Sequence, residues 1–103
     1  MIHISALQIQ EINQFVTLVE ALRYGFRSNI ETPMRHHHDY ANPKASQDST
    51  LLLMPSWEEG QNLGVKIITV SPDNGTYDLP SIQGVYLLFD AENGSPKAML
   101  DGK

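Results

Sequence analysis

The first part of the chain has the apolar spacing of an amphipathic helix. Over residues 6–28, apolar side chains recur at helical intervals in two neighbouring stripes. The stripes consist of Ile9, Ile12, Val16 and Val19, and of Phe15, Val19, Leu22 and Phe26. Ser5 with Gln8 three residues later has the form of a capping box. The periodicity leaves open whether Asn13-Gln14 divides the stretch into two helices, and residues 1–5 alternate like a short strand.

The second half of the chain has the pattern of β-strands. Apolar and β-branched runs predict strands over residues 50–54, 63–70, 85–89 and 97–100. The last two flank residues 90–95, whose Asn93-Gly94 pair predicts a hairpin. Residues 29–50 contain Pro33, Asn42 and Pro43 and indicate loops. We therefore expect one α+β domain, with N-terminal helices packed on a mostly antiparallel sheet.

Composition narrows the function classes. A chain of 103 residues is one domain, and its net charge of −5 argues against nucleic-acid binding because no basic stripe could neutralise phosphates. The absence of cysteine excludes disulfides and thiolate chemistry. The first residues lack the form of a signal peptide, and no apolar run reaches the roughly 18 residues of a membrane span. A cytoplasmic protein without membrane contact is expected.

Three kinds of site are disfavoured by residue spacing. In an extended segment, only His36 and His38 of the three adjacent histidines could converge, which is too few ligands for a strong metal site. Ser56 and the other serines lack a nucleophile motif, and Ser56 is expected in a turn beside Trp57. The glycines form no Gly-x-Gly-x-x-Gly loop, so these residues are not expected to bind a dinucleotide. We assign no catalytic, cofactor or metal residue to this chain.

Lys66 is the one charge in the run 63–70. That run is apolar enough to predict a strand covered on both faces, where an unpaired ammonium would cost several kcal/mol, roughly. A lysine at such a position suggests that it meets an anion. The alternative is a lysine on an edge strand whose ammonium reaches solvent. The run alone favours the alternative.

Five segments in order closely resemble the N-terminal domain of the ornithine cyclodeaminase/mu-crystallin family. They are 33–38 (PMRHHH), 51–57 (LLLMPSW), 63–70 (LGVKIITV), 79–90 (LPSIQGVYLLFD) and 98–102 (AMLDG). The resemblance covers nearly the whole chain. It implies that residues 1–103 are a substrate-binding and dimerisation domain, which forms a homodimer through its sheet, while a separate Rossmann domain binds NAD(H) or NADP(H). It also implies that Arg35 and Lys66 hold the carboxylate of a small amino or imino acid.

The resemblance also implies what lies beyond these residues. After Asp101-Gly102-Lys103 the family continues into a helix with a further carboxylate-binding arginine and then into the cofactor domain. The chain is therefore expected to be truncated before the NAD(P)-binding domain and to be inactive in hydride transfer by itself.

One position bears on the substrate. Ornithine-specific members place an acid two residues before the Met-Pro pair, where this chain has Leu52. A leucine cannot pair with an ammonium, so we expect a cyclic ketimine (Δ1-pyrroline-2-carboxylate) reductase. The alternatives are a fragment of an ornithine cyclodeaminase or alanine dehydrogenase, or a freestanding, non-catalytic dimerisation or small-anion-binding module.

Overall fold

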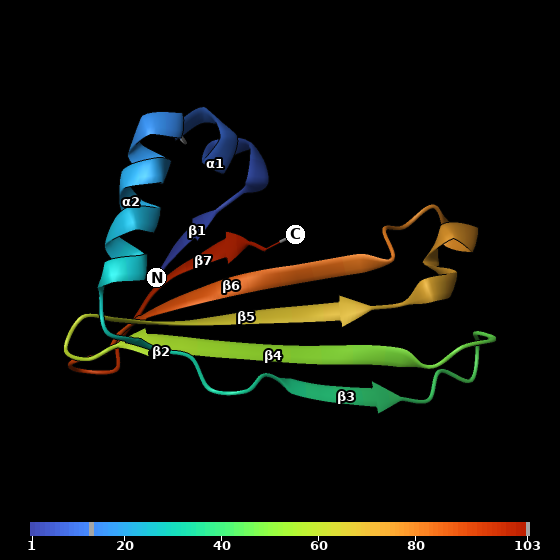
Figure 1. Cartoon of the computed structure of the whole chain (residues 1–103). Coiled ribbons are helices and arrows are strands. Elements are labelled where there is room, and N and C mark those ends of the chain that lie inside the picture. The colour runs from blue at the N-terminus through green and yellow to red at the C-terminus, as the bar shows by residue number, and fades with distance from the viewer. Residues whose placement is uncertain (13, 103) are drawn as a thin grey trace.

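The computed structural model describes residues 1–12 and 14–102. Its helices are α1 (Ala6–Ile12), α2 (Phe15–Arg27) and the 3₁₀ helix η1 (Pro72–Tyr77), and its strands are β1 (Ile2–Ile4), β2 (Ile30–Glu31), β3 (His36–Tyr40), β4 (Ser49–Glu58), β5 (Asn62–Val70), β6 (Ile82–Asp90) and β7 (Pro96–Asp101). The strands form one sheet in the order β1-β7-β6-β5-β4-β2, with β3 also paired to β4 (Figure 1). Only the β1–β7 pair is parallel among these described strands. The α+β class with a mostly antiparallel sheet is confirmed.

The helical region begins at the predicted capping box, and the structure decides the question of one helix or two that the periodicity left open. The Ser5 N–H donates to Gln8 Oε1 at 2.9 Å and the Gln8 N–H donates to Ser5 Oγ at 3.2 Å, which is the predicted capping box. Helix α1 ends at Ile12 and α2 begins at Phe15, so the chain forms two helices; Asn13 itself lies outside the described residues.

Strand β4 is longer than predicted because it continues through Pro55. The turn expected around Ser56 and Trp57 is wrong, since both residues pair with β5. On its outer side, β4 pairs with β3 only up to Leu53 and with β2 only from Trp57. Pro55 lies in the gap between these two partners, where a missing N–H leaves no outer ladder bond unmade.

The loop expected over residues 29–50 is also wrong in part. It contains β2 and β3, and all five residues of β3 are exposed. A polar run such as His36–Tyr40 carries no hydrophobic alternation from which a strand could be read. It is extended because its backbone pairs with the edge of β4.

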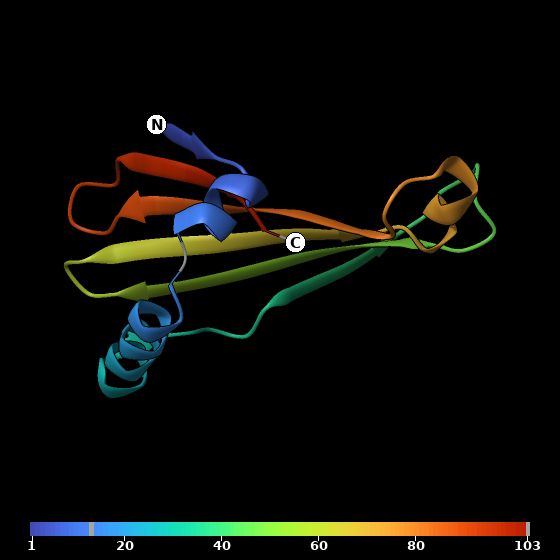
Figure 2. The ribbon, with the colours of Figure 1, turned by 90° about the horizontal axis from the view of Figure 1, so that it is seen from above.

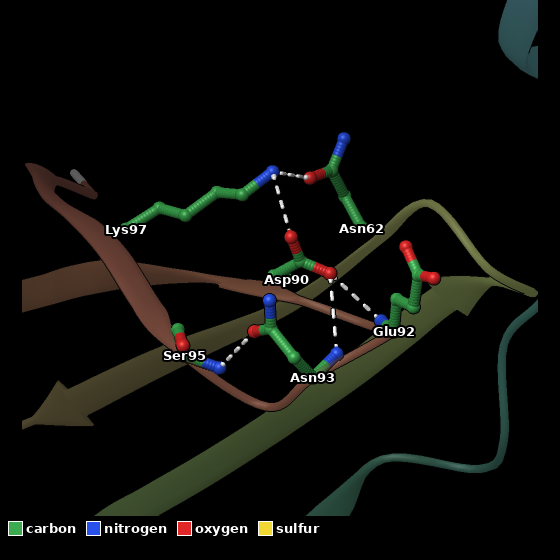
Figure 3. Close-up of polar contacts among 6 residues, drawn as sticks. All are labelled: Asn62, Asp90, Glu92, Asn93, Ser95 and Lys97. Carbon is green, nitrogen blue, oxygen red and sulfur yellow. Dashed lines mark hydrogen bonds and ion pairs between the residues drawn. The ribbon is translucent and has the colours of Figure 1, made fainter.

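The hairpin between β6 and β7 is closed by local hydrogen bonds (Figure 3). Asp90 Oδ1 accepts the Glu92 N–H at 2.8 Å, and Gly94 has a φ of 80°, which favours glycine. Lys97 Nζ donates to Asn62 Oδ1 at 2.8 Å and lies 3.9 Å from Asp90 Oδ2. The Asn93-Gly94 turn predicted from the sequence therefore forms, with a bulge after Leu88.

The sheet forms a single layer that the rest of the chain covers sparsely. Both views place α1 and α2 on the same side of the sheet (Figures 1 and 2). The accessible surface is 7810 Å², whereas a compact 11.5 kDa monomer would expose about 5,800 Å². The radius of gyration is 16.0 Å, against about 13 Å for a compact domain of this length. About 2,000 Å² of surface is thus in excess of what a compact monomer exposes.

Strand register sorts the side chains onto two faces. Paired residues of neighbouring strands share a face, so Met54, Lys66 and Tyr86 lie together; we call this the Lys66 face. Helix α2 lies on the same side, because Tyr24 Oη donates to Glu58 Oε1 at 2.7 Å and Glu58 has the parity of Met54. We call the other side the apolar face. Its strand residues include Leu51, Leu53, Trp57, Leu63, Val65, Ile67, Val85, Leu87, Phe89 and Met99.

Candidate functional site

Lys66 lies in the middle of β5, a central strand, yet its side chain is exposed. The expectation that protein covers both faces of this strand is wrong for the described residues. The helices stand over one part of the sheet only (Figures 1 and 2), and Lys66 is exposed although Gly64 and Ile68, its neighbours on the same face of β5, are buried. The alternative is wrong about an edge strand, because β5 pairs with both β4 and β6, but its prediction of a lysine that reaches solvent is confirmed. An exposed ammonium on a central strand is accessible to a ligand from one direction.

Arg35 directly precedes β3 and is also exposed. The β3–β4 register pairs His36 with Leu53, and continuing it by one residue sets Arg35 beside Met54, although Arg35 itself lies outside β3 and is not paired. Met54 in turn pairs with Lys66. On that register the two predicted carboxylate-binding residues fall in one row across the sheet, about 10 Å apart from strand to strand. Their side chains are long enough to span that gap, and neither has a hydrogen bond or ion pair within the described ranges.

Tyr86 is a neighbour of Lys66 that the sequence analysis missed. It pairs with Lys66 in register, and its ring lies over Gly64, the buried residue two positions before Lys66. A methyl group at Gly64 would overlap the Tyr86 hydroxyl and Cζ. A glycine inside a strand is a known indication of such a close approach, and Gly64 could have been read in that way.

Gly64→Ala should therefore destabilise the chain by about 1–3 kcal/mol, because the Tyr86 ring must leave its position. Gly75→Ala is the matched control, since no atom lies within 4 Å of the added methyl group there. The free energy of unfolding, measured by urea denaturation, tests the difference. Equal stability of the two variants would contradict the packing of Tyr86 on Gly64.

A polar cluster borders the Lys66 face at strand β3. Asp39 Oδ1 accepts a hydrogen bond from Thr50 Oγ1 at 2.7 Å and lies 3.0 Å from His37 Nε2. These hydrogen bonds, with that from Thr50 first, lower the pKa of Asp39 below its ordinary value of 3.8. Leu52 lies beside this cluster, since it pairs with His37 on β3 and with Ile68 on β5. The Asp39 carboxylate is ionised and already held by Thr50 and His37.

His36 and His38 project on the opposite side of β3 from His37. Their ring centroids are 5.9 Å apart, so the convergence expected from strand alternation is present. Across residues 1–12 and 14–102, no three His, Cys, Asp or Glu side chains are placed to share a metal ion. A two-histidine pair supplies too few ligands for a structural or catalytic metal site.

A second acidic residue, Asp73 of η1, links loop 41–48 to η1 by hydrogen bonds. Asp73 Oδ2 accepts the Ser46 N–H at 2.7 Å and the Ser46 hydroxyl at 2.8 Å. These bonds, the backbone one first, lower the pKa of Asp73. They join loop 41–48 to η1 and leave the Asp73 carboxylate fully engaged in a structural contact.

Comparison with known proteins identifies the family and the relatives to which the chain is similar. Residues 2–103 match the model of the ornithine cyclodeaminase/mu-crystallin family. An uncharacterised protein of Schizosaccharomyces pombe is 42% identical over 85% of this chain and 27% of its own length. The Δ1-pyrroline-2-carboxylate reductase of Colwellia psychrerythraea is 32% identical over 96% of this chain and 31% of its own length.

The fold has a counterpart among solved structures. The Δ1-pyrroline-2-carboxylate reductase of Thermococcus litoralis, solved with NADH and L-proline, superposes with a TM-score of 0.74 at 24% identity. The match covers 100% of this chain and 32% of that protein. The chain therefore spans between about a quarter and a third of the length of these three proteins. Among its described helices, none is both long and apolar enough to cross a bilayer.

Proposed function

The chain belongs to the ornithine cyclodeaminase/mu-crystallin family, and on that basis we propose that residues 1–103 form the substrate-carboxylate-binding and dimerisation domain of an NAD(P)-dependent enzyme. The proposed reaction is reduction of a cyclic ketimine such as Δ1-pyrroline-2-carboxylate, in the cytoplasm. The row formed by Arg35, Met54 and Lys66 is the observation on which the proposal rests.

The two cations of this row suit a small carboxylate. Both are exposed and unpaired within the described residues, so binding an anion requires no existing ion pair to be broken. Arg35 can supply the two parallel donors of a guanidinium, whereas Lys66 supplies a point charge. Such charge-assisted hydrogen bonds fix the carboxylate and leave the rest of the substrate free to face a cofactor.

The position of Leu52 supports a substrate without a second ammonium group. Leu52 shares the Lys66 face and lies two residues from Met54 on β4. The nearby Asp39 carboxylate is already held by Thr50 and His37. The loss of one charge-assisted contact is worth roughly 1.5–3 kcal/mol, which disfavours ornithine by about ten- to hundredfold. The relatives named as Δ1-pyrroline-2-carboxylate reductases agree with this preference.

A nicotinamide cofactor does not fit the residues of this chain. The described part has no Gly-rich strand–turn–helix unit to hold a pyrophosphate, and its sheet is antiparallel except at β1–β7. We propose that NAD(H) or NADP(H) is held by a further part of the protein, outside residues 1–103. The relatives are about three times as long, and the solved reductase of Thermococcus litoralis contains NADH and L-proline.

We assign dimerisation to the apolar face. The helices are on the other side of the sheet, so a second copy of the chain can approach this face directly (Figures 1 and 2). A standard interface buries about 800 Å² per partner, and the excess surface of the chain is more than twice that. The Lys66 face would then remain free for the substrate.

Lys66→Met should weaken binding of pyrrole-2-carboxylate by tenfold or more, because the variant loses the ammonium. The affinity of the unaltered 103-residue chain should be about millimolar, since a small ligand then has only part of its site. A titration followed by NMR of the ¹⁵N-labelled chain measures both values.

Lys44→Met is the control for charge alone, because Lys44 is exposed in loop 41–48, away from the row. Its affinity should equal that of the unaltered chain. Because Lys66 is exposed, Lys66→Met should change the free energy of unfolding by no more than about 0.5 kcal/mol. The same affinity in Lys66→Met and the unaltered chain would contradict the proposed role.

A further inference from the structure

Two hydroxyl groups on the Lys66 face have no hydrogen-bond partner within the described ranges. One is Ser56 Oγ on β4, and the other is Tyr86 Oη on β6. Ser56 pairs with Gly64 in register, and the Tyr86 hydroxyl lies directly over Gly64. The two hydroxyls therefore approach one spot on β5 from its two flanking strands. The missing side chain of Gly64 is what lets the Tyr86 hydroxyl reach that spot.

Both residues line a pocket of about 160 Å³ beside β2. Ile30 and Leu88 give it apolar walls, and Glu58 and Asn62 also line it. Glu58 Oε1 accepts from the Tyr24 hydroxyl and Asn62 Oδ1 accepts from Lys97 Nζ, so one oxygen of each already has a partner. The volume corresponds to about five water molecules, which suits a single small ring with a carboxylate.

We propose that Ser56 and Tyr86 are further substrate-binding residues, whose hydroxyls donate to the carboxylate of a small cyclic imino acid seated in this pocket, beside the Tyr86 hydroxyl. The inference rests on the proposed function and adds two donors to it. Lys66 lies two residues from Gly64, about 7 Å along the same face of β5. Its side chain is long enough to bring the ammonium to the same carboxylate.

In this arrangement the two cations attract the ligand, and the two hydroxyls orient it. Lys66 and Arg35 attract the anion, but their flexible side chains fix its direction poorly. Ser56 has a short side chain on a paired strand, and the Tyr86 ring is held against the backbone at Gly64. Two positioned hydroxyl donors therefore orient the carboxylate plane, and the apolar walls at Ile30 and Leu88 contact the ring carbons.

Two variants of the 103-residue chain test the proposal. Tyr86→Phe keeps the ring over Gly64 and removes its hydroxyl, and Ser56→Ala removes the other donor. Each should weaken pyrrole-2-carboxylate binding about tenfold, because a hydrogen bond to a charged group is lost. Each should change the affinity for the uncharged pyrrole-2-carboxamide less than threefold. Tyr40→Phe, on exposed strand β3, is the matched control and should bind like the unaltered chain.

The outcomes separate the two proposals. If Lys66→Met loses binding while Tyr86→Phe and Ser56→Ala both stay within twofold of the unaltered chain, the hydroxyl assignment is overturned and the proposed function stands. An equal loss for carboxylate and carboxamide would also overturn it, because the hydroxyls would then act through packing. If the unaltered chain binds no pyrrole-2-carboxylate at tens of millimolar, both proposals fail. Backbone spectra that match the unaltered chain establish that each variant is folded.

Discussion

Leu87→Lys should convert the chain from a dimer into a monomer at micromolar concentration. Leu87 lies at the centre of the apolar face, where it pairs with Val65 on β5 and Met99 on β7. In a two-fold interface each substitution would bring two lysines into the same desolvated region. The cost of burying unpaired charges should weaken association by at least about a hundredfold. Sedimentation velocity of the variant and the unaltered chain measures the change.

A control is needed because α2 also exposes apolar side chains. Leu22 is 51% exposed on α2, so Leu22→Lys introduces the same charge on the other side of the sheet. That variant should remain dimeric if the apolar face forms the contact. Dissociation of Leu22→Lys with retention of the dimer in Leu87→Lys would assign the interface to the helices instead. A monomeric unaltered chain would contradict dimerisation through either surface.

The sequence predicted well the elements that local patterns determine. The run around Lys66 became β5, the Ser5–Gln8 capping box formed, and Asn93-Gly94 closed the predicted hairpin. Each of these depends on residues within a few positions of one another. Strand β3 and the extension of β4 through Pro55 were missed because they depend on pairing with distant residues. Backbone pairing imposes strand structure on a polar segment that has no strand pattern of its own.

The prediction that protein covers both faces of the strand around Lys66 was wrong for a related reason. An apolar strand usually indicates cover on both faces, but here about 2,000 Å² of excess surface is left uncovered by the described chain. The convergence of Ser56 and Tyr86 over Gly64 could not be predicted either, because it depends on the register of three strands. Arg35 and Lys66 were identified from the family resemblance, and their roles stay a prediction.

The 103-residue chain should reduce no Δ1-pyrroline-2-carboxylate by itself. Hydride transfer requires a nicotinamide held against the imine carbon; the sequence contains no Gly-rich phosphate loop, and the part of the chain that the structure describes contains no βαβ unit. With NADH or NADPH present, the absorbance of the reduced nicotinamide should fall no faster than in buffer. A full-length Δ1-pyrroline-2-carboxylate reductase, assayed in parallel, establishes that substrate and cofactor are competent. Turnover by the chain alone would require a cofactor site among residues 1–103 and would overturn the division of labour proposed here, in which Arg35 and Lys66 hold the carboxylate and a separate domain supplies the hydride.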